Sequence, residues 1–482
     1  MSSSKISLAF QKVKGAYSLD LRALGLLRIG LGLTLLLDAV LRLSDLEAHY
    51  SNQGILPLEA LFKYMWNDNY FSIFTISGNK FIILFLFIIY ILSAIFLTVG
   101  LKVRWATFIC YLFILSIHNR NPLIHQAGDD LMRLILFIGF FLPWDKRYAL
   151  DESNYENLHF SNRSFSIAGL AYILQVAYVY FFSALLKTSP EWTSDFTALY
   201  YSLSLDQIAL PVGKLIYPYY DLLKFLTAAV FYIELYLPFL LFVPIFNYVF
   251  RMTFILVVLG LHIGITLCLN VGLFPVIGIV SLLGLIPTEV MDVIGEKFKI
   301  LNRRDHTHVK YFQEKFLVSI FAIIFIFYSI SWNLETVGKK TTIRDLGLYF
   351  PAHFLRIDQQ WGMFAPAVFK DDGWFVFVGQ TKNGREINLD GSDSINYLTP
   401  SYRSGPFYKD RWRKYSENIL LVNNSHFRTY FNSYLLNSWN EAASQDKKVD
   451  KVQMIYMKEV SLPNYEKSLP KKELLAEVSI VK

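Results

Sequence analysis

Residues 171–192 read AYILQVAYVYFFSALLKTSPEW, and the rest of the chain can be interpreted outward from this stretch. It is a run of apolar and aromatic residues, which predicts a helix, and it carries a single lysine, Lys187. The helix should end there because Thr-Ser-Pro (188–190) follows. At about 100° per residue, Tyr180, Ser183 and Lys187 fall on one side of the helix, so a hydroxyl-lined stripe ends in an amine.

The surroundings of Lys187 suggest chemistry. An ammonium group at the edge of hydrocarbon loses its hydration shell, so its neutral, basic form should become accessible. The alternative is a lysine at the end of a membrane span whose amine extends to the lipid headgroups. A chemical role therefore requires that the amine be enclosed.

The composition is that of a membrane protein. Of the 482 residues, 54% are hydrophobic, 17% aromatic and only 18% charged. The apolar residues occur in blocks of about 20, which as helices cross a hydrocarbon core of about 30 Å. We therefore expect a polytopic α-helical membrane bundle that has the lipid bilayer as a partner.

The apolar blocks predict about nine spans. These are 21–41, 81–100, 104–118, 130–143, 166–187, 222–245, 248–269, 272–287 and 315–332. Three parts follow: a cytoplasmic N-terminal segment (1–20), a transmembrane domain (21–332) and a C-terminal extracytoplasmic α+β domain, rich in β-strands (333–482).

The net charge of +7 indicates orientation in the membrane rather than binding to nucleic acid, and no nucleic-acid partner is expected. With a cytoplasmic N-terminus, one side of the membrane collects most of the basic residues. These are Lys5, Lys12, Lys14, Lys102, Arg104, Lys146, Arg147, Arg163, Arg251, Lys297, Lys299, Arg303, Arg304, Lys310 and Lys315. The other side keeps Lys63, Arg120, Lys187 and Lys214. This asymmetry follows the positive-inside rule and predicts that Lys187 and the C-terminal domain are extracytoplasmic.

Several ionisable residues lie inside the predicted spans, where each costs about 2.5–3.5 kcal/mol unless it is paired or hydrated. They are Arg28, Asp38 and Arg42 in the first span, Asp129, Asp130 and Arg133 at the fourth, Glu234 in the sixth and His262 in the seventh. Asp38 and Arg42 have the spacing of an ion pair on one helix face, as do Asp130 and Arg133. Structural bridges would explain each pair, but the number of ionisable residues favours a polar cavity within the bundle.

Beyond residue 333 the charged residues become more frequent and alternating patterns replace the apolar blocks. Residues 374–389 predict a β-hairpin around the Asn-Gly at 383–384. Residues 451–460 and 474–481 predict further strands. The C-terminal domain should therefore contain a small sheet.

Two segments of the tail are rich in aromatic residues. Residues 359–368 (QQWGMFAPAV) could lie against the membrane domain, whereas 409–415 (KDRWRKY) predicts a turn or helix at the surface. The cysteines, Cys110 and Cys268, both lie in apolar runs, so no disulfide is expected in the tail. No phosphate-binding loop, HExxH, GxSxG or Cys/His metal spacing is present, and no metal site is predicted.

Five blocks of the sequence occur in a familiar order. They are LLRIGLGLTLLLDAVLR (26–42), HYSNQGILPLEAL (49–61), HNRNPLIHQAGDDLMRLILFIGFFLPWDKRYALD (118–151), QVAYVYFFSALLKTSPEWTSDFTALYYSL (175–203) and GLHIGITLCLNVGLFP (260–275). In this order they resemble HTTM-domain proteins, the family of membrane domains that includes the vitamin K-dependent γ-glutamyl carboxylases and their bacterial relatives. The resemblance covers roughly residues 20–290.

The resemblance implies an activity. In the carboxylases, a lysine after the aromatic helix is taken to deprotonate vitamin K hydroquinone, which then reacts with O₂, and the resulting strong base allows a glutamate to capture CO₂. Lys187 stands at that place here, and His262 matches a carboxylase histidine. The implied quinone pocket also includes Tyr180, Ser183, Trp192, Asp129, Asp130, Arg133 and Glu234. Reduced vitamin K or menaquinol is the implied cofactor, in a bacterial inner membrane.

One departure from the carboxylases bears on the substrate. Gly128-Asp129-Asp130 replaces an asparagine-histidine pair of the carboxylases, and the tail is shorter than the region that grips a propeptide in animal enzymes. The second interpretation is therefore an accessory membrane protein that helps a secreted peptide to mature or be exported. A third is transport along the buried polar residues, although the spans show no inverted repeat.

Overall fold

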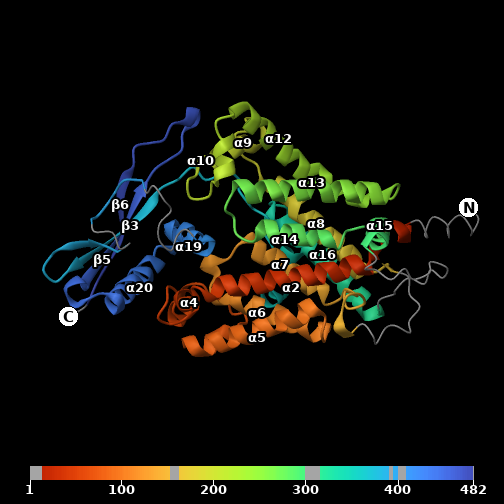
Figure 1. Cartoon of the computed structure of the whole chain (residues 1–482), viewed down its shortest axis with the longest axis horizontal. Helices are drawn as coiled ribbons and strands as arrows, with labels where there is room; N and C mark the ends of the chain where they lie inside the picture. The colour runs from red at the N-terminus through yellow and green to blue at the C-terminus, as the bar shows by residue number, and fades with distance from the viewer. Residues whose placement is uncertain (1–12, 152–161, 299–314, 390–393, 400–408, 481–482) are drawn as a thin grey trace, which may run out of the picture.

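The computed structural model describes residues 13–151, 162–298, 315–389, 394–399 and 409–480. A helical bundle forms the larger part of the molecule, and a sheet with two helices lies at one end of it (Figure 1). The first 12 residues of the predicted cytoplasmic segment lie outside the described residues, as do the basic residues between 299 and 314.

Six helices of the described chain are long and apolar enough to cross a membrane. They are α2 (Leu21–Leu43), α5 (Lys80–Val99), α8 (Ile167–Leu186), α12 with η4 (Tyr220–Tyr236, Leu237–Phe242), α13 (Asn247–Cys268) and α16 (Phe316–Thr336). A bent pair, α14 (Phe274–Leu283) and α15 (Thr288–Phe298), turns by 89° and would make a seventh span. The predicted membrane bundle is thus present, but the count of nine spans is not confirmed.

The other two predicted spans are helices in the structure, but they are not among those long and apolar enough to cross a membrane. They are α6 (Val103–Arg120) and α7 (Ala127–Gly139). With 13 residues, α7 is about 20 Å long, too short for the hydrocarbon core. Nearly all of its residues are buried, from Gly128 to Gly139, as expected for a helix packed among others. Its apolar sequence therefore reflects burial within protein rather than contact with lipid.

Local sequence signals set the helix ends and contacts. Asp20 caps α2 and Asn79 caps α5, because each side chain accepts a backbone N–H of the first turn. α2 and α5 pack closely at Gly32, where a Cβ atom would lie 2.3 Å from Oγ1 of Thr98. Figure 1 shows α2, α5 and α6 side by side.

Short helices connect the long ones. They are α3 (Leu46–Tyr50), α4 (Leu58–Tyr64), α9 (Pro190–Thr193), α10 (Ala198–Ser204), α11 (Pro211–Ile216), α17 (Thr342–Asp345) and α18 (Phe350–Leu355), with the small β1–β2 pair (Leu19–Asp20, Arg163–Ser164).

The C-terminal domain contains a four-stranded antiparallel sheet in the order β4-β3-β5-β6. Its strands are β3 (Trp374–Thr381), β4 (Glu386–Asn388), β5 (Val449–Lys458) and β6 (Lys471–Ser479). Gly384 has a φ of 77° in the β3–β4 turn, which explains the Asn-Gly signal. The predicted hairpin and both later strands are confirmed.

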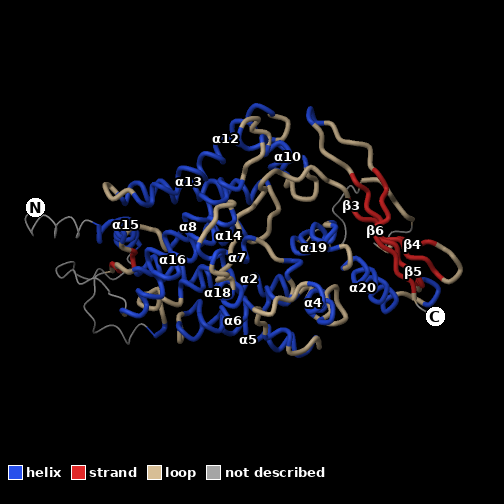
Figure 2. The backbone as a smooth tube through the Cα atoms, turned by 180° about the vertical axis from the view of Figure 1, so that it is seen from behind, coloured by secondary structure: helices blue, strands red, loops and turns tan. Residues whose placement is uncertain are grey.

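Two helices accompany the sheet, α19 (Asp410–Leu420) and α20 (Phe427–Ala442). α20 packs on the sheet through Phe431, whose ring centroid is 5.4 Å from that of Phe377. α19 lies between α20 and the end of the bundle (Figure 2). The α+β character of this domain agrees with the prediction.

Candidate functional site

Lys187 follows the last residue of α8, and its amine is enclosed. The residue is 3% exposed. Its Nζ donates to Oγ of Ser183 at 2.9 Å, one turn earlier, and forms an ion pair with Glu234 of α12. The ring of Trp192 covers the amine, with its centroid 4.7 Å from Nζ. The interpretation of Lys187 as a lysine that extends to lipid headgroups is therefore wrong.

Tyr180 and His262 form a second buried pair on the same side of α8. The Tyr180 hydroxyl and Nε2 of His262 are 2.8 Å apart. Gly278 of α14 leaves room for the imidazole, since a Cβ there would lie 2.3 Å from its ring. Nδ1 of His262 is buried and has no hydrogen-bond partner among the described residues. The stripe predicted on α8 thus exists, and α12 and α13 complete it.

A segment of the C-terminal half covers the end of α8. Backbone N–H of Ser189 donates to the carbonyl of Pro366 at 3.1 Å, and Nε1 of Trp192 donates to the carbonyl of Phe364 at 2.9 Å. Deeper in the bundle, the side chains of Gln359 and Gln175 pair at 2.8 Å. The prediction that residues 359–368 lie against the membrane domain is confirmed.

An ion pair joins α9 to the C-terminal half just beyond this segment. Oε1 of Glu191 is 2.7 Å from Nζ of Lys370. The hydrogen bond from Lys370 lowers the pKa of the Glu191 carboxyl to about 2. The carboxylate is therefore ionised at neutral pH, and the contact between α9 and the C-terminal half is electrostatic as well as apolar.

Asp129 belongs to a separate cluster at the junction of the bundle and the C-terminal domain. Arg42 bonds Asp38 at 2.7 Å and Asp129 at 2.9 Å. Arg411 of α19 bonds the same two carboxylates, each at 2.7 Å. Burial opposes the charge of Arg411, but the attraction of Asp129 and Asp38 outweighs it and raises the pKa of the guanidinium above its ordinary value.

The surface position predicted for residues 409–415 is thus wrong for three of them. Arg411 enters the bundle as described, Trp412 is 2% exposed, and Tyr415 is fully buried. The only advance signal was indirect: Asp38 and Asp129 together carry more negative charge than Arg42 alone can balance.

Arg133 has a different role from the one expected for a pocket residue. Its Nη2 bonds Asp130 at 2.6 Å, one turn away, so the predicted helical pair is present. The same guanidinium donates to the carbonyls of Arg356 and Asp358. Irregular backbone that lies within a membrane bundle needs such donors, and Arg133 supplies them to the segment that leads to Gln359.

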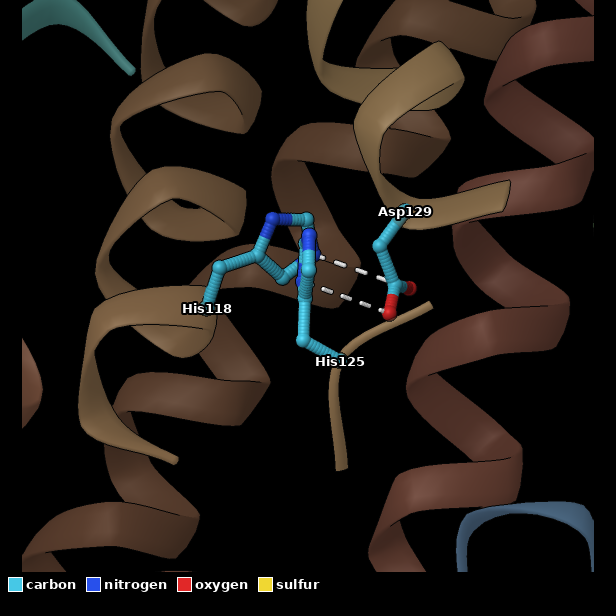
Figure 3. A group of neighbouring side chains, drawn as sticks. All are labelled: His118, His125 and Asp129. Carbon is cyan, nitrogen blue, oxygen red and sulfur yellow. Dashed lines mark ion pairs between the residues drawn. The ribbon is translucent and has the colours of Figure 1, made fainter. Parts of the chain in front are cut away.

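His118, His125 and Asp129 come together although their sequence spacing did not predict it (Figure 3). Nε2 of His118 and Nδ1 of His125 each lie 3.6 Å from an oxygen of Asp129, and the three ligand atoms fall within 4.8 Å of one another. The two 3.6 Å distances are close to the roughly 3.3–3.6 Å between neighbouring ligand atoms of a tetrahedral metal ion.

The hydrogen bonds of this group disfavour a metal ion. Arg133 lies 3.1 Å from Nδ1 of His118 and can only donate, so the ring proton belongs on Nε2, the atom that faces Asp129. Arg42 and Arg411 already bond both oxygens of Asp129. A divalent ion would have to displace the Nε2 proton of His118, and it would lie beside the guanidinium groups of Arg42 and Arg411. The group is therefore a cluster of charged and polar side chains, in which Asp129 bonds Arg42 and Arg411 and His125 bonds Asp130.

The predicted site residues thus fall into two clusters. One cluster contains Lys187, Ser183, Trp192, Glu234, Tyr180 and His262. The other contains Asp129, Asp130 and Arg133. Phe274 lies between them: its ring contacts His262, with centroids 5.4 Å apart, and its backbone packs against Gly128. Comparison of the chain with protein-family models, curated proteins and solved structures finds no match.

Proposed function

We propose that this chain is an integral membrane enzyme of the carboxylase type, in which Lys187 takes a proton from the phenolic hydroxyl of a reduced quinone such as vitamin K hydroquinone or menaquinol. The observation that carries the proposal is the enclosure of this amine. It lies at the end of an aromatic helix and contacts a hydroxyl, a carboxylate and an indole ring. A lysine that only marked the end of a span would be expected to reach water or headgroups.

The side chains around Lys187 have the polar groups that would hold the hydroxyl of a quinol. Lys187 and Ser183 would hold a phenolic oxygen, and the unbonded Nδ1 of His262 offers a further polar contact. Trp192 and Tyr180 supply aromatic surface for the ring. When bound, a reduced quinone would supply the O₂-dependent oxidation that drives carboxylation by CO₂.

Glu234 makes the amine available as a base. Transfer of one proton from Nζ of Lys187 to Oε2 of Glu234 leaves a neutral amine and a neutral carboxylic acid, with no change in total charge. The amine then accepts the phenolic proton and becomes an ammonium again. Trp192 and the Phe364–Pro366 cover exclude water, which protects strongly basic species from quenching.

We further propose that the N-terminus is cytoplasmic and that a glutamate-containing peptide or small acid approaches from the extracytoplasmic side of a bacterial inner membrane. Two features support this orientation. The basic residues follow the positive-inside rule. Residues 13–20 and the sheet domain lie at opposite ends of the bundle (Figure 1).

A non-enzymatic accessory protein for a secreted peptide is the second candidate. The observation that favours it is that Lys187 has a full set of partners within the chain, as a purely structural lysine would. In that case the C-terminal domain would carry the binding function.

Mass spectrometry of exported peptides co-expressed with the protein, with and without menaquinone, tests the proposal. The expected result is a menaquinone-dependent added carboxylate that Lys187→Ala abolishes and Lys214→Ala leaves unchanged. Lys214 is a suitable control because its side chain is 56% exposed and pairs with Asp206 on the surface. Lys187→Ala with Glu234→Gln avoids leaving a buried carboxylate unpaired. Carboxylation that survives in this folded double variant would exclude Lys187 as the base.

A further inference from the structure

The loop between β5 and β6, residues 459–470, leaves the sheet and reaches the helical bundle. The hydroxyl of Tyr465 bonds the carbonyls of Tyr217 and Pro218 at 3.2 and 3.0 Å. These carbonyls directly precede α12, whose apolar span begins at Tyr220. Tyr465 therefore lies at the start of a helix that is long and apolar enough to cross a membrane.

Polar contacts hold the loop in this position. The Tyr200 hydroxyl donates to the carbonyl of Leu462 and accepts the backbone N–H of Tyr465, both at 2.7 Å. Nζ of Lys467 lies 2.9 Å from Asp206, which belongs to the bundle, and 2.9 Å from Asp372 of the C-terminal half. The loop thus cannot leave the bundle without breaking several hydrogen bonds and ion pairs.

Large apolar side chains are exposed beside these contacts. The exposed fraction is 92% for Leu469 and 44% for Tyr465 in the loop, and 72% for Leu215 and 63% for Tyr219 in and after α11. Tyrosine is enriched where a protein meets the headgroup layer, because its ring is apolar and its hydroxyl polar. In water this concentration of exposed apolar area would be unfavourable.

We propose that the 459–470 loop and α11 form one membrane-contact surface that seats the C-terminal domain on the headgroup layer of the bilayer that its own bundle spans. The argument for lipid as the occupant is continuity. The surface adjoins the exposed side chains of α12, where Leu222 is 42% and Phe225 68% exposed. This inference does not depend on the proposed chemistry of Lys187.

Electron paramagnetic resonance in lipid nanodiscs tests the inference. Nitroxide labels would be placed at Leu469→Cys and Leu215→Cys in the full chain after replacement of Cys110 and Cys268. Asn383→Cys is the matched control, because the exposed β3–β4 turn lies at the end of the sheet domain far from the bundle in both views (Figures 1 and 2). Retained thermal unfolding behaviour shows that each labelled protein is folded.

The expected result is a several-fold higher ratio of accessibility to O₂ over a water-soluble nickel complex at positions 469 and 215 than at 383. Equal ratios at all three positions would place the loop in water and overturn the proposal. Labels at 469 and 215 that are shielded from both reagents would also overturn it, because the surface would then be covered by a second copy or another protein.

Discussion

The Lys187 cluster and the Arg411 cluster both bury charge, but they differ in how many partners each charge has. Lys187 has one carboxylate, Glu234, and the pair joins two neighbouring helices. Arg411 has two, Asp38 and Asp129, and Arg42 bonds both of them as well. An isolated pair can become neutral by one proton transfer, whereas a four-membered network cannot. The first arrangement suits chemistry, and the second fastens the C-terminal domain to the bundle.

Replacing Arg411 should give the largest effect on stability. Arg411→Met leaves Asp38 and Asp129 with a single guanidinium, and breaking a buried ion pair in this way costs about 3–5 kcal/mol. Lys414→Met, on the same helix, should cost at most about 1 kcal/mol because its pair with Glu417 is partly exposed. Equilibrium unfolding in detergent micelles measures both. Equal stabilities of the two variants would show that the network does not hold the domains together.

A double-mutant cycle on Lys187 and Glu234 should show an intermediate effect. Lys187→Met or Glu234→Gln alone leaves one buried group without its partner, and because that single group can become neutral by gaining or losing a proton, the cost is about 1–3 kcal/mol. The double variant should be more stable than the sum of the two losses allows, because neither charge remains. The same unfolding measurement gives the coupling free energy. Strictly additive losses would mean that the ion pair does not form in solution, which would weaken the contrast between the clusters.

The ion pair between Glu191 and Lys370 should contribute least, and its effect should depend on pH. Because the folded state lowers the pKa of Glu191 to about 2, the contribution is fully present above the unfolded value of about 4.3. It is lost as the pH falls from there toward 2. For this surface-edge pair we expect Glu191→Gln to reduce the free energy of unfolding by about 0.5–1 kcal/mol at pH 7, and by less at pH 3. A difference that stays constant over this range would point to packing rather than charge.

Much of the fold could be predicted because its signals are local. Apolar blocks of about 20 residues identified the six long helices, and the alternation around the Asn-Gly turn identified the β3–β4 hairpin. α7 shows where such reasoning fails. Apolar composition records burial but does not separate lipid from protein as the surroundings, so a short core helix looked like a span.

The candidate site was predictable only on the helix that carries most of it. The stripe of Tyr180, Ser183 and Lys187 followed from helical periodicity. Grouping Asp129, Asp130 and Arg133 with Lys187 did not hold, because the partners of a buried charge depend on which helices are neighbours. Arg411 lies 282 residues beyond Asp129, and no pattern in either segment indicates that the two will meet.

The sequence by itself determined that this chain forms apolar helices followed by a sheet, and that one amine ends an aromatic helix, because hydrophobic periodicity is a property of neighbouring residues. Only the tertiary structure decided that Glu234 pairs with this amine, that Trp192 and residues 364–366 enclose it, and that Arg411 joins the two domains. The physical reason is that a charge removed from water must find an opposite charge or a hydrogen bond wherever the packing of distant segments supplies one.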